Sequence, residues 1–88
     1  MEKRVFVIVK EINMDGMLSP ETSVEVFEDK GKALLRKYEL QNLAREDFED
    51  FEKNEIEEEE TRISFSIYQK GWYLTNHINI TLTEQKVL

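Results

Sequence analysis

Ten of the nineteen carboxylates in this 88-residue chain lie within residues 46–60 (EDFEDFEKNEIEEEE), beside a single cation, Lys53. This acidic segment carries a formal charge of −9, whereas the other residues hold nine acids and eleven bases and sum to +2. Carboxylates at such density attract cationic groups, and salt screens the attraction over about 10 Å. The sequence therefore indicates a nearly neutral protein with one anionic region, and a basic partner surface is the leading functional hypothesis.

We predict that the acids of this segment supply charge to a protein partner and that two apolar residues supply contact area. The candidate partner-binding residues are Glu46, Asp47, Phe48, Glu49, Asp50, Glu52, Glu55, Ile56, Glu57, Glu58, Glu59 and Glu60. Carboxylates a few ångströms apart can occupy a groove built for phosphates. One form of the hypothesis is thus an inhibitor that mimics nucleic acid and binds a nucleic-acid-binding protein. The simpler alternative is a solvated segment that serves only solubility, and weak binding of divalent cations is a third.

In size, acidity and expected layout, the chain resembles small proteins of phages and mobile elements. Some of those act as inhibitors, including anti-CRISPR proteins that mimic nucleic acid. No specific motif carries this resemblance, so it implies a type of function and no individual site residues.

Other reactive residues are few. There is no cysteine and His77 is the only histidine, so thiolate chemistry and a multi-histidine metal site are excluded. The three isolated glycines cannot form a phosphate-binding loop. Residues 11–22 approximate a twelve-residue calcium loop, but the twelfth position holds Thr22 where a bidentate glutamate is needed. We expect no enzymatic activity, no cofactor and no bound metal.

A second functional hypothesis uses one face of a sheet. Tyr68, Tyr73 and His77 fall on the same face of two alternating segments, where aromatic rings could stack on bases or on a small ligand. Only Arg62 and Lys70 lie near them, so the cationic groove of a nucleic-acid binder is missing. With a net charge of −7, we expect no direct binding of nucleic acid and no attraction to anionic membranes.

Four segments have the pattern of strands. Residues 5–12 are apolar on both faces at their start, which is typical of an interior strand, and residues 22–28 alternate after a turn. Residues 61–68 place Ile63, Phe65 and Ile67 inward, and residues 72–83 alternate again. We expect these last two strands to form a hairpin with a tight turn at Gln69–Gly71.

A long helix is expected between the two pairs of strands, with Asp29 as its N-cap. One sector of this helix holds the apolar residues Ala33, Leu34, Tyr38, Leu40, Ala44, Phe48 and Phe51. Phe48 and Phe51 would anchor the acidic segment, which is expected to be a helix end or loop. The helix ends at Asn54, or the chain bends near Glu46 and begins a second short helix.

The expected fold is a two-layer α+β sandwich, in which one long helix covers one face of an antiparallel four-stranded sheet in the order β-β-α-β-β. The length predicts one domain over residues 1–88. The apolar run at Val5–Val9 is too short for a signal peptide or a membrane helix, and the lack of cysteine favours the cytoplasm. The sequence leaves the oligomeric state open.

Overall fold

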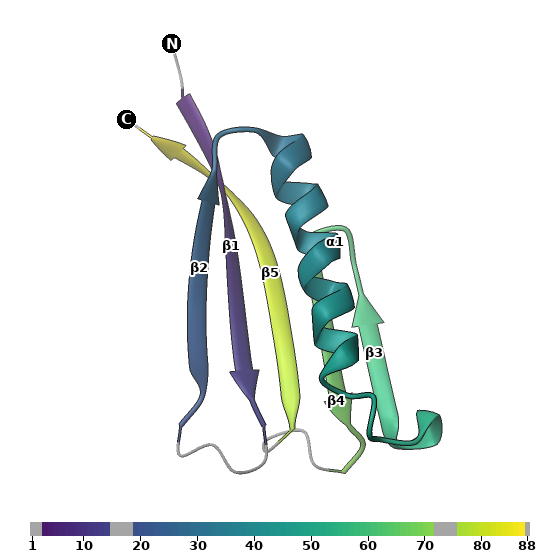
Figure 1. Ribbon diagram of the computed structural model, residues 1–88. Helices are drawn as coiled ribbons and strands as arrows, with labels where there is room; N and C mark the ends of the chain where they lie inside the picture. Colours follow the sequence, from purple (N-terminus) through teal and green to yellow (C-terminus); the bar gives the residue numbers. More distant parts are fainter. Residues whose placement is uncertain (1–2, 15–18, 72–75, 88) are drawn as a thin grey trace.

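The computed structural model describes residues 3–14, 19–71 and 76–87. These residues form one helix on one face of a five-stranded antiparallel sheet (Figure 1). The elements are β1 (Lys3–Asn13), β2 (Glu21–Phe27), α1 (Lys30–Glu46), the 3-10 helix η1 (Lys53–Glu55), β3 (Ile56–Glu60), β4 (Ser64–Gln69) and β5 (His77–Val87). Their order across the sheet is β2-β1-β5-β4-β3. The α+β class and the single covering helix are confirmed.

The prediction of a four-stranded sheet is wrong, because a fifth strand, β3, forms within the acidic segment. β3 pairs with β4 and becomes one edge of the sheet, where Glu59 lies opposite Ser66 and Glu57 opposite Tyr68. Glutamate has a low intrinsic preference for strands, and Ile56–Glu60 has no hydrophobic alternation. The helix end or loop expected for the whole acidic segment therefore stops before Ile56.

The two expected antiparallel pairs are present. β1 pairs with β2, placing Val7 opposite Val26, and β4 pairs with β5, placing Phe65 opposite Ile80. β1 also pairs along its whole length with β5, so β1 has a neighbour on both sides, as its two apolar faces predict.

The connection between β4 and β5 is longer than the expected tight turn at Gln69–Gly71. β4 ends at Gln69 and β5 begins only at His77. Gly71 has a positive φ of 79°, in the left-handed region that favours glycine. The expected strand residues 72–75 lie outside the described residues.

Helix α1 begins as predicted, because the Asp29 side chain accepts a hydrogen bond of 3.0 Å from the Lys32 amide. Of the two endings considered, the chain leaves the helix at Glu46. The short element that follows is the single 3-10 turn η1.

The predicted inward face of α1 is partly wrong. Tyr38 is exposed, and the buried residues are Ala33, Lys37, Leu40, Gln41 and Ala44. Their spacing follows helical periodicity, so two polar side chains occupy core positions. The reason is tertiary, since both make hydrogen bonds that satisfy them at the end of β3.

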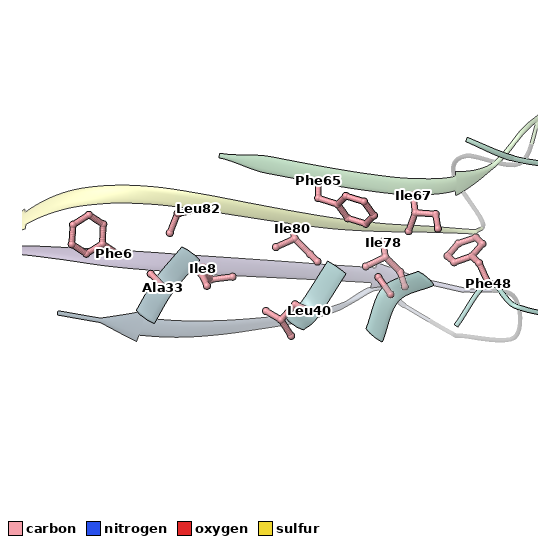
Figure 2. Packing of buried hydrophobic residues seen from close by; sticks show 11 residues of the cluster. Phe6, Ile8, Ala33, Leu40, Phe48, Phe65, Ile67, Ile78, Ile80 and Leu82 are labelled. Atoms are coloured by element: carbon pink, nitrogen blue, oxygen red, sulfur yellow. The ribbon is translucent and has the colours of Figure 1, made fainter. Parts of the chain in front are cut away.

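The core lies between α1 and the covered face of the sheet, as Figure 2 shows. Its strand residues are Phe6, Ile8, Phe65, Ile67, Ile78, Ile80 and Leu82. Ile63, expected to point inward, is 57% exposed because it lies in the β3–β4 connection, before the ladder of β4 begins. Among the described residues, no helix is long and apolar enough to cross a membrane.

Candidate acidic interaction surface

The acidic segment starts at the last residue of α1, passes through turns and η1, and ends as the edge strand β3. All ten of its carboxylate residues are exposed. The turns, η1 and the start of β3 lie at one end of the molecule, opposite to the chain termini (Figure 1). The chain therefore turns back after α1 and forms one edge of the sheet, with acidic side chains along the whole segment.

Two phenylalanines anchor the segment, as predicted. Phe48 is 1% exposed and Phe51 is half-buried, and their ring centroids lie 5.3 Å apart. Figure 2 shows Phe48 at the end of the core nearest Ile67 and Ile78. The Phe51 amide donates to the Phe48 carbonyl at 3.1 Å, so the turn between the two rings is itself hydrogen-bonded. Burial of these rings holds the turn after α1 against the sheet.

The glutamates of β3 are largely engaged within the protein. On the helix side, Glu58 accepts a hydrogen bond of 2.9 Å from Arg45, and Glu60 accepts one from Gln41. On the opposite side, the Tyr68 hydroxyl donates to Glu57 at 2.9 Å and lies 3.5 Å from Glu59. Because side chains alternate across a strand, β3 meets both the helix and the open face of the sheet.

The other six acids differ from these four. They are Glu46, Asp47, Glu49, Asp50, Glu52 and Glu55. Within the described ranges, none of the six has an ion pair or a side-chain hydrogen bond. Their charges are therefore available to an external cation, while Glu58 is already neutralised by Arg45.

A cleft of about 590 Å³ lies within this surface. Its apolar lining is Phe48, Phe51, Ile56 and Ile67, and its charged lining is Arg45, Glu49, Lys53 and Glu58. It thus brings the predicted apolar contact residues Phe48 and Ile56 together with two of the predicted acids. Phe48 is almost fully buried, so the half-buried Ile56 and Phe51 offer the apolar contact area instead. Such a site can hold the aliphatic stem of a lysine or arginine and present a carboxylate to its charged head.

Lys37 is a residue of this region that the sequence reasoning missed. It is 1% exposed, and its ammonium donates to the Gln41 side chain and, at 3.3 Å, to the Thr61 carbonyl. Burial lowers the pKa of Lys37 below its ordinary value, and the nearby charge of Glu60 opposes that change. Its spacing in the sequence could have indicated that Lys37 is buried, because it lies four residues after Ala33 and seven before Ala44.

The residues of the second hypothesis are only partly placed together. Tyr68 and His77 are paired neighbours on the open face of the sheet, and Tyr73 lies outside the described residues. His77 is buried, with Nε2 3.1 Å from the carboxylate of Glu11, so its ring offers little surface for stacking. A hydrogen bond to Glu57 raises the pKa of Tyr68 to about 12.

Among the described residues, no group of three or more His, Asp or Glu side chains is arranged to hold a metal ion. The loop that approximates a calcium site is not fully covered, since residues 15–18 lie outside the described residues. Comparison of the chain with protein families, curated proteins and solved structures gave no match.

Proposed function

We propose that this protein is an interaction module that binds a basic surface of a protein partner through the acidic segment. The observation that carries the proposal is a set of six exposed carboxylates over residues 46–55 that have no ion pair within the described part of the chain, next to a cleft with apolar and charged lining. Scattered acids would be enough for solubility. Glu49, one of these six acids, lines the cleft together with Phe51 and Ile56, an arrangement suited to a cationic side chain with an apolar stem.

The electrostatics support fast and salt-sensitive binding. A region of one sign concentrates the field at one end of the molecule and steers a partner of opposite charge. The apolar cleft then adds short-range contact, which is less sensitive to salt. Lys53 lines the same cleft and opposes an incoming cation, so the segment's only cation limits the affinity.

In a more specific form of the proposal, the partner is a nucleic-acid-binding protein and the module is its inhibitor. Arginines that normally hold phosphates can hold carboxylates with similar geometry. The prediction is competition, since a nucleic acid and this protein would then exclude one another from the partner. The absence of cysteine supports placing this interaction in the cytoplasm.

The test is recovery of partners from extracts of the source cell with wild type and two matched variants. In the first variant, Glu46, Glu49, Glu52 and Glu55 are changed to glutamine, and in the second, Glu21, Glu28, Glu39 and Glu84 are changed. Both variants remove four negative charges from the net −7, and all eight residues are exposed. The second variant also loses the exposed ion pairs of Glu28, Glu39 and Glu84 with Lys3, Arg36 and Arg4, which contribute little to stability. The proposal expects the first variant to lose the partner and the second to keep it.

The recovered partner is then measured directly at rising salt. We expect the affinity to fall between about 50 and 500 mM salt, chiefly through slower association. A partner that binds both variants equally well, with no dependence on salt, contradicts the proposal. Changes at Glu57–Glu60 are a poorer test, because those side chains also hold β3 in place.

A further inference from the structure

The two edges of the sheet differ in chemistry. The edge formed by β3 carries four consecutive glutamates, and charged side chains are a common means of preventing edge-to-edge pairing. The edge formed by β2 has two valines that face solvent, Val24 at 58% and Val26 at 61% exposure. Its central acid, Glu25, is engaged by Arg36 at 3.0 Å. The β2 edge therefore lacks the protection that the β3 edge has.

The exposed valines continue into an uncharged strip on the open face of the sheet. Val24 lies opposite Val9 and Val26 opposite Val7, and β5 continues these rows with Thr81 and Thr83. In a chain of which 35% is charged, these two rows carry no ionisable side chain. In Figure 1, β2 is the outermost strand at the left, and α1 lies on the other face of the sheet.

We propose that β2 pairs with β2 of a second copy of this chain, antiparallel and across a two-fold axis at Val24. The two sheets then form one continuous sheet with both helices on the same face. Such an interface uses the same surface on both copies, which is the commonest arrangement of protein dimers. In an edge strand, alternate residues direct their N–H and C=O groups away from the sheet and are free to pair.

The charges of β2 select this register. With Val24 on the axis, all seven residues of β2 pair, and Glu25 lies opposite Ser23 and Glu21 opposite Phe27 of the second copy. A shift of one copy by two residues places Glu25 opposite Glu25, or Glu21 opposite Glu25. A shift by one residue would put the helices on opposite faces, because side chains alternate across a strand. Within these choices, only the pairing centred on Val24 uses the full strand without opposing two carboxylates.

The position of the negative charge in the chain also favours β2 over β3 as the contact. β2 and β3 are the two opposite edges of the sheet, so pairing through β2 places the two acidic segments at the outer edges of the doubled sheet. At about 4.8 Å per strand, they would lie about 43 Å apart, well beyond the screening length of about 8 Å at physiological salt. Pairing through β3 would instead bring both acidic segments together.

The first test is the molar mass in solution, measured by sedimentation over about a hundredfold range of protein concentration, since dimer formation follows mass action. We expect wild type to shift from monomer to dimer. Val24→Lys and Val24→Glu should each remain monomeric, because like charges would meet on the axis. An equimolar mixture of these two variants should form a dimer again, since opposite charges then face one another.

The matched control is Ile63→Lys. Ile63 is as exposed as Val24 and equally β-branched, but it lies in the β3–β4 connection. We expect this variant to dimerise like wild type. Circular dichroism confirms that each variant is folded, and re-association of the mixture shows in addition that both folded chains keep a competent edge.

Three results would overturn the proposal. One is a wild type that stays monomeric, in which case the β2 edge is left for the strand of a different protein. Another is a Val24→Lys variant that dimerises as well as wild type, which would move the contact elsewhere. The third is a mixture of folded Val24→Lys and Val24→Glu chains that stays monomeric, which would contradict the register. None of these results depends on the acidic segment, so this proposal and the proposed function fail separately.

Discussion

The guanidinium of Arg45 joins α1 to β3, because its Nε lies 2.9 Å from Oε1 of Glu58 and its central carbon lies 5.0 Å from the ring centroid of Phe65. Arg45 stands in the last turn of α1, where a cation also complements the helix dipole. Glu58 belongs to the edge strand, so this contact holds the far end of the acidic segment back against the helix. The same cation therefore stabilises the fold and neutralises part of the acidic surface.

Replacing Arg45 should lower stability modestly. We expect Arg45→Gln to reduce the free energy of unfolding by about 1 kcal/mol, since a half-exposed ion pair and a cation–π contact each contribute up to about that amount. Urea denaturation measures the change. Arg62→Gln is the control, because Arg62 is exposed and has no ion pair among the described residues. Equal losses in both variants would contradict a specific role for Arg45.

Much of the fold could be predicted from local patterns. Alternation over residues 61–68 and 72–83 indicated the C-terminal hairpin, and the two apolar faces of residues 5–12 indicated an interior strand. β3 could not be predicted, since Ile56–Glu60 has no period of two. Its conformation depends on the ladder with β4 and on contacts with Arg45 and Tyr68, which lie on other elements.

The acidic segment and its anchor Phe48 could be predicted from composition and helical spacing, and Phe48 is buried as expected. The sequence could not predict which acids make side-chain hydrogen bonds within the protein and which do not. This depends on which residues of α1 and β4 face Glu58 and Glu57, and that follows from the register of an unpredicted strand. The burial of Lys37 was not predicted, because a lysine is usually exposed even where its helical spacing matches that of core residues. Only the tertiary structure supplies acceptors for its ammonium.

The anchoring of the acidic segment should depend on Phe48 far more than on Phe51. We expect Phe48→Ala to cost about 3–5 kcal/mol of unfolding free energy, because it empties a fully buried site. Phe51→Ala should cost less than half as much, since this ring is half-buried. Urea denaturation of both variants checks the order, and a larger loss for Phe51→Ala would reverse the assignment of the anchor.

The burial of Lys37 predicts a specific pH dependence of stability. Because its folded pKa is lowered below the ordinary 10.5, the unfolded chain binds this proton more tightly. Stability should therefore rise as the pH rises through the lowered pKa towards 10.5. In Lys37→Met, this rise should be absent, so the free energy of unfolding should change less between about pH 7 and pH 10. Lys32→Met, at an exposed position of the same helix, should keep the wild-type slope.

Lys37→Met alone also leaves the Gln41 side-chain oxygen without its donor, which lowers stability at every pH. The double variant Lys37→Met with Gln41→Leu removes both partners of that bond. It also removes the hydrogen bond from Gln41 to Glu60, so Gln41→Leu alone is the control for that loss. If the double variant keeps the wild-type pH slope, Lys37 is not the group responsible.

Tyr68 should titrate far above a free tyrosine. Its hydroxyl donates to Glu57, and this bond exists only while the phenol is protonated, so the pKa rises from 10.0 to about 12. Burial and the charge of Glu59 act in the same direction. The contribution of Tyr68 to stability is thus fully present below pH 10.0 and is lost as the pH rises through about 12.

The measurement is phenolate absorbance during an alkaline titration, with the Tyr68→Phe spectrum subtracted to isolate one residue. We expect Glu57→Gln to lower the pKa of Tyr68 more than Glu59→Gln does, because the bond to Glu57 is the largest cause and the Glu59 oxygen is farther away, at 3.5 Å. If the subtracted signal titrates near pH 10.0, the Tyr68 hydroxyl does not form hydrogen bonds with Glu57 and Glu59. In that case Glu57 and Glu59 would join the free charges of residues 46–55, and the acidic surface would extend along the open side of β3.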